Sequence, residues 1–424
     1  MSTTSTKRTV AGPIDGPQHY GSTVAAGGGF AFIAATAMDA RGDLAAAAVP
    51  AEPYSSSAAA RAQAQAEQIF SGLEVSLAEV GSSVVDILQV EQYVELKVHA
   101  DPYFKIATSK KYLGAAVPVA ATAQVGEYHP QGAVVSVTGL AIVPDESSGF
   151  VKSSPDEVGP STANRKFSEI IVAGPYVFTT LFPSDRKSGL PEAARTPEWI
   201  WSGSEIGAEA KWGLAELENR LTAVGASFAD VVDYTIFLTD ASDLFEWDAA
   251  LKAAVGEAAP SRTVIPSRGY ALPRREGAFG HADGAPRMEV QLRIRRPEAG
   301  VDKIVVPGPG EGFGYQSAGV RLGGLLWLSS QYADEAARTG DIGAEIDNIL
   351  DKLAEVSANG GTSLDQALRI RAQFRRAEDV HALSGALRKR FPSAPPVVSV
   401  LVVPSAFPVP TARVAIDAVV AHGA

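Results

Sequence analysis

The sequence of 424 residues contains no cysteine. This absence excludes disulfide bonds, thiolate catalysis and cysteine-ligated metal sites, and it is typical of a reducing compartment. The 6 histidines are scattered without a His-x-x-x-His or His/Asp cluster, so we expect no bound metal. The glycine run at residues 27–29 precedes no helical pattern and indicates a turn, not a phosphate-binding loop. We therefore expect no cofactor.

Long apolar runs are also missing: no stretch approaches the roughly 20 residues that a membrane helix needs, and the first residues lack the apolar core of a signal peptide. Basic side chains are in the minority, because 37 Lys and Arg accompany 48 Asp and Glu for a net charge of −11. A field of that sign disfavours nucleic acid and anionic membranes as partners. We expect a soluble, cytoplasmic protein with no nucleic-acid or membrane partner.

What the sequence does contain is a threefold repeat with a period of about 140 residues. In each copy an amphipathic helical pattern ends at a glycine, and an aspartate follows five residues later. These turns are residues 81–86, 225–230 and 360–365. Glycine adopts the left-handed conformation that closes a helix, and the polar turn leads into a strand. We predict three domains, at residues 14–146, 165–298 and 301–424.

Each predicted domain has the same order of elements: a strand hairpin, a helix, a strand, a second helix and a final pair of strands. Two helices on one face of a mixed sheet make an α+β layer. The opposite face of each sheet is also largely apolar and must be buried. Three sheets that face inward around a pseudo-threefold axis, with the helices outside, would bury it. We expect a single-chain pseudo-trimer that is a monomer in solution, with a dimer as the alternative.

This order of elements, together with the stretch LTAVGASFADVVDYTIFLTD at residues 221–240, resembles the Rid family of reactive intermediate (enamine/imine) deaminases. These are small trimeric proteins of the chorismate-mutase-like fold. The resemblance implies sites in clefts between subunits, where an arginine holds the substrate carboxylate and a glutamate orients water. Pro260-Ser261-Arg262-Thr263 resembles the arginine motif, and Met288-Glu289-Val290 resembles the glutamate strand. The other two domains lack both, so we expect one complete site, built from Arg262 and Glu289.

The resemblance also implies an aromatic residue in the wall of the cleft. Tyr20 and Tyr315 occupy this position in the first and third domains, and Phe167 occupies it in the second. The sequence does not decide which of them faces Arg262, and an aromatic anchor of the core is the alternative for each.

The resemblance also implies small polar residues in the lining of the cleft. Thr179 and Thr180 of the second domain fall where the family's strand end lines the cleft, as do Ser329 and Ser330 of the third domain. The second domain alone carries insertions, at residues 187–203 and 267–287, and long loops of this kind favour a lid or a specificity wall.

The residue types fit this chemistry. A guanidinium group is a planar fork that binds a carboxylate through two hydrogen bonds, and water held by Glu289 could attack an imine carbon without a cofactor. We expect a cofactor-independent hydrolase that deaminates a small carboxylate-bearing imine, enamine or related C–N compound in a dedicated catabolic step. The alternative is a non-catalytic small-molecule binder or scaffold that uses the same arginine pocket.

Overall fold

The computed structural model describes residues 9–17, 19–50, 57–127, 130–145, 150–154, 167–184, 190–196, 204–270, 286–309 and 313–423. Much of the two insertions expected to form a lid lies outside these residues. The described chain is a mixed α+β protein, and none of its helices combines the length and the hydrophobicity needed to cross a membrane.

Three consecutive segments of the chain share one order of main elements, to which α3 (Leu113–Ala116), β12 (Gly269–Tyr270) and α6 (Glu335–Arg338) each add one short element in a single segment. The first segment comprises β1 (Thr9–Asp15), β2 (Tyr20–Gly27), β3 (Phe30–Thr36), α1 (Ala58–Glu79), β4 (Ile87–Val94), α2 (Lys97–Ala107), α3 (Leu113–Ala116), β5 (Val119–Gln124) and β6 (Val135–Ile142). The second comprises β7 (Lys152–Ser153), β8 (Ile170–Ala173), β9 (Tyr176–Leu181), α4 (Glu205–Ala223), β10 (Val231–Leu238), α5 (Leu244–Val255), β11 (Ser261–Pro266), β12 (Gly269–Tyr270) and β13 (Met288–Arg295). The third comprises β14 (Lys303–Val306), β15 (Gly319–Leu322), β16 (Leu325–Gln331), α6 (Glu335–Arg338), α7 (Ile342–Asn359), β17 (Ala367–Phe374), α8 (His381–Arg390), β18 (Val397–Val402) and β19 (Val414–Ala421).

Strand order is also common to the segments: β5-β4-β6-β3-β2, β11-β10-β13-β9-β8 and β18-β17-β19-β16-β15. The second strand of each order is β4, β10 or β17. It pairs parallel with the strand before it in the order and antiparallel with the strand after it. A bulge interrupts the antiparallel pair at the same place, directly before Gln89, Asp233 and Arg369. This shared irregularity fixes which residues of the three segments correspond.

The long helices begin and end as their sequences dictate. Ser57, Ser204 and Asp341 cap α1, α4 and α7, because each side chain accepts a hydrogen bond from a backbone N–H in the first turn. Gly81 and Gly225 follow α1 and α4 with φ of 78° and 67°. The third helix differs from the prediction: Gly360 has φ of −77°. Its neighbour Gly361 adopts the left-handed conformation instead, with φ of 81°.

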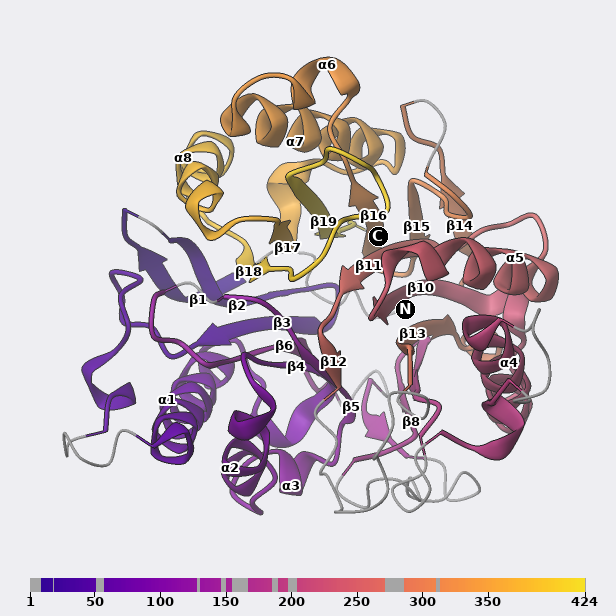
Figure 1. Ribbon diagram of the computed structural model, residues 1–424, viewed down its shortest axis with the longest axis horizontal. Helices are drawn as coiled ribbons and strands as arrows, with labels where there is room; N and C mark the ends of the chain where they lie inside the picture. Colours follow the sequence, from indigo (N-terminus) through magenta and orange to yellow (C-terminus); the bar gives the residue numbers. More distant parts are fainter. Residues whose placement is uncertain are drawn as a thin grey trace.

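Helices lie at the periphery of the molecule and strands toward its middle (Figure 1). The sheets of the first and third segments join where Ser22 of β2 pairs with Val397 of β18, and β12 of the second segment pairs with β5 of the first. The inner faces bury aromatic side chains against one another. The ring centroids of Phe30 and Tyr176 are 5.3 Å apart, and those of Tyr176 and Trp327 are 6.1 Å apart. Side chains from all three segments therefore share one inner core.

Candidate functional site

Neighbouring segments meet at three similar junctions. Strand β5 contacts β9 at the first–second junction, β11 contacts β16 at the second–third junction, and β18 contacts β2 and β3 at the third–first junction. The common register of the strands shows which residues correspond at the three junctions, and these residues differ. Ala120 and Val398 correspond to Arg262, and Ser136 and Ala415 correspond to Glu289.

Arg262 lies at the second–third junction, on β11, and is only 2% exposed. Its Nη1 forms an ion pair with Asp248 of α5, at 2.6 Å from Oδ1 and 2.5 Å from Oδ2. Its Nε donates to Gln316 Oε1 at 3.1 Å, and its Nη2 donates to the carbonyl oxygen of Phe313. The backbone N–H of Arg262 donates to Ser329 Oγ of β16 at 2.9 Å. Every nitrogen of the guanidinium group therefore has a partner.

Tyr315 is the predicted aromatic residue that the structure places at this junction. Its backbone N–H donates to Asp248 Oδ2 at 2.9 Å, and its hydroxyl donates to the carbonyl oxygen of Gly256 at 2.5 Å. A second aromatic residue, Tyr332, lies half-buried nearby, with its ring 6.3 Å from that of Phe313. Burial raises the pKa of Tyr332, and the charge of Arg262 opposes this shift.

Glu289 lies at a different junction, between the first and second segments. Its Oε2 accepts a hydrogen bond from the backbone N–H of Thr122 in β5, at 3.2 Å. On β10, Glu289 is opposite Phe237, whereas Arg262 is opposite Tyr234. Because side chains alternate along a strand, the two side chains leave opposite faces of the sheet. The expectation of one site that contains both Arg262 and Glu289 is therefore wrong in this geometry.

The buried Glu289 carboxyl group makes a pH-dependent prediction. Burial raises its pKa well above 4.5, although the Thr122 N–H opposes the shift. A raised carboxyl pKa gives stability that is complete below the unfolded pKa of about 4.3 and is lost as pH rises through the folded pKa. We expect Glu289→Gln, which stays neutral, to raise the free energy of unfolding at pH 8 by at least about 1.4 kcal/mol, the value of one pKa unit, and to change it little at pH 4.

Urea unfolding at both pH values measures this difference. Glu257→Gln is the matched control, since the Glu257 side chain is 92% exposed and should shift stability equally little at either pH. A Glu289→Gln variant that is no more stable than wild type at pH 8 would contradict the raised pKa of the Glu289 carboxyl group.

The other two predicted aromatic residues lie at the remaining junctions. The Tyr20 hydroxyl donates to the carbonyl oxygen of Phe391 at 2.7 Å, and the Arg388 guanidinium lies 5.1 Å from the Tyr20 ring, so Tyr20 belongs to the third–first junction. Phe167 lies 6.4 Å from Phe104 between ring centroids, at the first–second junction. Each junction therefore has its own aromatic residue.

Thr179 and Thr180 do not reach Arg262 through any hydrogen bond of the described residues. The Thr179 hydroxyl donates to the carbonyl oxygen of Glu169 at 2.7 Å, and that of Thr180 donates to the carbonyl oxygen of Val290 at 3.3 Å. The strand-end residue that contacts Arg262 is Ser329 of the third segment.

Sequence reasoning missed Asp248 and Gln316, the two side chains that bond the Arg262 guanidinium. Asp248 is one of several acidic residues around α5, and nothing in its spacing sets it apart. Gln316 directly follows the predicted wall residue Tyr315, and this neighbouring position is the one sequence signal that could have indicated Gln316.

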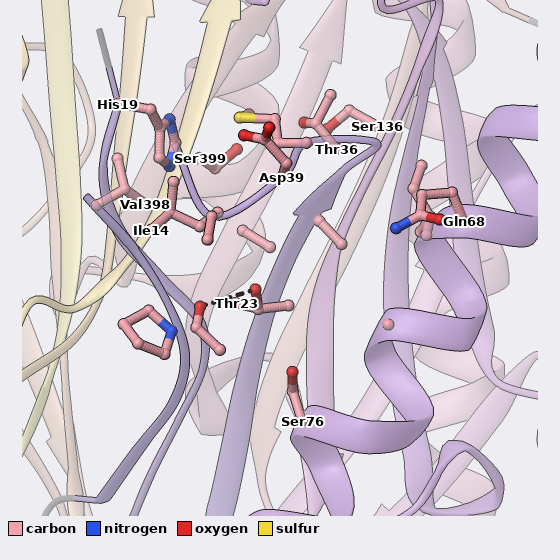
Figure 2. Close-up of a pocket in the computed structure, with 18 of the residues that line it drawn as sticks. Ile14, His19, Thr23, Thr36, Asp39, Gln68, Ser76, Ser136, Val398 and Ser399 are labelled. Atoms are coloured by element: carbon pink, nitrogen blue, oxygen red, sulfur yellow. Dashed lines mark hydrogen bonds between the residues drawn. The ribbon is translucent and has the colours of Figure 1, made fainter. Parts of the chain in front are cut away.

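The third–first junction contains a cavity of about 200 Å³ (Figure 2). Val398 and Ser136, which correspond to Arg262 and Glu289, both line it. The positions of the arginine and of the glutamate are therefore brought together only when they come from neighbouring segments. Among the described residues, no group of three or more His, Asp or Glu is placed to hold a metal ion.

Comparisons with known proteins bear on the second segment above all. Residues 163–273 match the family model described as Endoribonuclease L-PSP, which represents the Rid (YjgF) proteins. This region includes Arg262 and ends before Glu289. No curated protein matches the chain.

Solved structures resemble the chain at low identity. A crystal structure of chorismatase is 14% identical, covers 79% of this chain and 93% of its own, and has a TM-score of 0.48. A putative endoribonuclease L-PSP from Entamoeba histolytica is 21% identical, covers 28% of this chain and 100% of its own, and has a TM-score of 0.26. RidA from the Antarctic bacterium Psychrobacter sp. is 15% identical, covers 28% and 94%, and has a TM-score of 0.24.

Proposed function

We propose that the chain is three Rid-type units in tandem, at residues 14–146, 165–298 and 301–424, which form the equivalent of a trimer within one chain. The common strand order, the common bulge and the three similar junctions support this proposal. Because one chain supplies all three junctions, we expect a monomer in solution.

The function that the geometry supports best is the binding of a small carboxylate-bearing molecule at the second–third junction. The observation that carries this proposal is that two neutral acceptors bind one edge of the Arg262 guanidinium group, the edge formed by Nε and Nη2. Its Nε and Nη2 hydrogens point the same way, and they are met by two neutral oxygens, Gln316 Oε1 and the carbonyl of Phe313. A ligand carboxylate offers two oxygens to this same edge, and its charge-assisted hydrogen bonds are stronger than those of neutral acceptors.

Binding is better supported than turnover. At this junction Ala415 occupies the position that corresponds to Glu289, so the expected water-orienting carboxylate is absent from it. Both oxygens of Asp248 are already engaged by Arg262, and Oδ2 also accepts the Tyr315 N–H. The non-catalytic reading of the sequence is therefore the stronger one.

Cofactor-independent hydrolysis of an imine or enamine at the same junction is the second candidate. The match of residues 163–273, which include Arg262, to the Endoribonuclease L-PSP model favours it. In this reaction water adds to the carbon of the C=N bond, the C–N bond then breaks, and ammonia leaves as the 2-oxo acid forms. A dedicated catabolic step in the cytoplasm would be its setting.

The Arg262→Lys variant tests the binding site. Lysine keeps a positive charge beside Asp248 but lacks the two-donor edge, so we expect affinity for pyruvate, the simplest 2-oxo acid, to fall about ten- to a hundredfold, as for the loss of a hydrogen bond to a charged group. Isothermal titration calorimetry measures the affinity. Arg413→Lys is the matched control, because Arg413 makes a similar pair with Glu345, 2.9 Å from Nε to Oε2, away from Arg262.

Turnover is measured on the same proteins. An amino-acid oxidase generates 2-imino acids, and semicarbazide reports the imine that remains. Pyruvate binding without faster imine loss identifies a binder, whereas acceleration that Arg262→Lys abolishes identifies a hydrolase. Pyruvate binding of equal strength in wild type and Arg262→Lys would contradict both.

A further inference from the structure

We propose that the cavity at the third–first junction is a binding site for a neutral, polyhydroxylated molecule of about the size of a pentose. This inference goes beyond the proposed function, because it concerns another junction and another chemical class of ligand.

The walls of the cavity come from both segments. Strand β18 of the third segment supplies one wall, and β1, β2, the end of β3, the following loop, β6 and α1 of the first segment supply the rest. Figure 2 shows His19, Thr36, Asp39, Ser136 and Ser399 gathered at the top of the view, with Gln68 of α1 to the right of them and Ser76 of α1 farther down.

The charge of the lining disfavours an anionic ligand. No arginine or lysine is among the described residues that line the cavity, and Val398 stands where the second segment has Arg262. A carboxylate or phosphate placed here would lose its hydration without gaining a cation, and burying an unpaired charge is strongly unfavourable. The one lining carboxylate, Asp39, is exposed and already holds its own loop, because its Oδ1 accepts the N–H groups of Arg41 and Asp43 at 2.8 and 3.1 Å.

The remaining polar lining consists of the imidazole of His19 and of groups that both donate and accept. Hydroxyl groups come from Thr23, Thr36, Ser76, Ser136 and Ser399, and an amide comes from Gln68. Between them lie apolar side chains that include Ile14, Ile69 and Val400. Alternating hydroxyl groups and apolar surface match the hydroxyl groups and C–H faces of a sugar or polyol.

Ser399 gives an independent indication of a missing ligand. Ser399 is 4% exposed, and its buried Oγ has no hydrogen-bond partner among the described residues. Leaving a buried hydroxyl group unpaired is costly, so an occupant of the cavity that bonds this group gains affinity. The corresponding residue of the first segment is Ala121, so this hydroxyl is not required by the position in the fold.

The size of the cavity sets the size of the ligand. A volume of about 200 Å³ holds roughly six water molecules at about 30 Å³ each. A pentose ring with its hydroxyl groups replaces such a cluster of waters and satisfies the same hydrogen bonds.

D-ribose and ribitol are the probes, and D-ribonate is their carboxylate analogue. Saturation-transfer NMR detects binding, and a titration gives the dissociation constant. We expect wild type to bind ribose or ribitol in the millimolar range and to bind ribonate more weakly. Ser399→Ala and Ser136→Ala should each weaken the binding of the neutral probe about three- to tenfold, as for the loss of one hydrogen bond.

Ser184→Ala is the matched control, since the Ser184 hydroxyl is also buried, has no partner in the part of the chain that the structure describes, and does not line this cavity. Circular dichroism checks that the variants fold. Retention of neutral-probe binding in Ser184→Ala and its loss in Ser399→Ala support the proposal. Binding of neither ribose nor ribitol by wild type, stronger binding of ribonate, or equal binding by Ser399→Ala overturns it, whatever the result with pyruvate at Arg262.

Discussion

Replacement of Glu91 by glutamine is expected to lower the free energy of unfolding by about 3 kcal/mol or more, as for a buried ion pair that loses one partner. Glu91 of the first segment is 2% exposed and forms ion pairs with Arg371 of the third segment, at 2.6 Å, and with Arg293 of the second, at 3.2 Å. Burial alone would raise its pKa, but these arginines together with Arg369 outweigh burial and lower it far below its usual range. Glu91 is therefore ionised and holds the three segments together.

The surrounding residues show why glutamine cannot replace it. Arg371 also pairs with Asp417 at 2.7 Å, and Arg293 also pairs with Asp233 at 3.1 Å. Removing the charge of Glu91 leaves three arginines in this cluster, with Arg369 as the third, facing two carboxylates. The uncompensated charge is buried among all three segments, where water cannot solvate it.

Denaturant unfolding followed by tryptophan fluorescence measures this effect, and Trp327 reports on the cluster because its ring lies 5.4 Å from the Arg293 guanidinium. Glu67→Gln is the control, since Glu67 pairs with Lys111 only at 4.0 Å and both side chains are more than half exposed. Its loss should cost less than about 1 kcal/mol. Equal losses in the two variants would show that the buried cluster does not hold the segments together.

Local signals explain how much of the fold could be predicted. Gly81 and Gly225 end helices where the sequence places those ends, because a left-handed glycine after an apolar helix is a signal within one turn of chain. Gly360 was assigned wrongly because Gly361 beside it satisfies the same rule. Such signals are read from neighbours in the sequence and need no knowledge of the tertiary fold.

The candidate site depends on contacts that no local pattern records. Arg262 was found from its motif, but its partner Asp248 lies on another element, and Gln316 belongs to the next segment. No local pattern records the contacts of the buried cluster around Glu91 either. In this cluster Glu91, Thr235 and Arg371 occupy corresponding positions in the three segments. These three residues differ in type, and they bond to one another only when the three segments have assembled.

The mistaken pairing of Arg262 with Glu289 has the same origin. The two lie on one segment and resemble one motif set, yet each junction combines the arginine position of one segment with the glutamate position of the next. The second–third junction therefore keeps a cation, the first–second junction keeps an acid, and the third–first junction keeps only Val398 and Ser136. Each junction therefore has a separate chemistry.

Asp248→Asn is expected to move stability and ligand affinity in opposite directions. Asparagine retains the shape of the side chain but leaves the buried Arg262 without its counterion, so we expect the free energy of unfolding to fall by about 1–3 kcal/mol, the cost of a poorly satisfied buried charged group. The same change removes a negative charge beside the edge of Arg262 that would bind a carboxylate. Repulsion between unit charges about 6 Å apart in a partly buried site is on the order of 2–3 kcal/mol, so pyruvate should bind roughly thirty- to a hundred-and-fiftyfold more tightly.

The opposite signs make this variant informative. Calorimetric titration with pyruvate gives the affinity, and urea unfolding gives the stability. Asp243→Asn is the control, because Asp243 pairs with Arg287 at 2.8 Å in the same segment and has no bond to Arg262 among the described residues. It should lose stability without gaining affinity. If Asp248→Asn loses both stability and affinity, the carboxylate does not bind at the Nε–Nη2 edge of Arg262, and the ion pair with Asp248 is only structural.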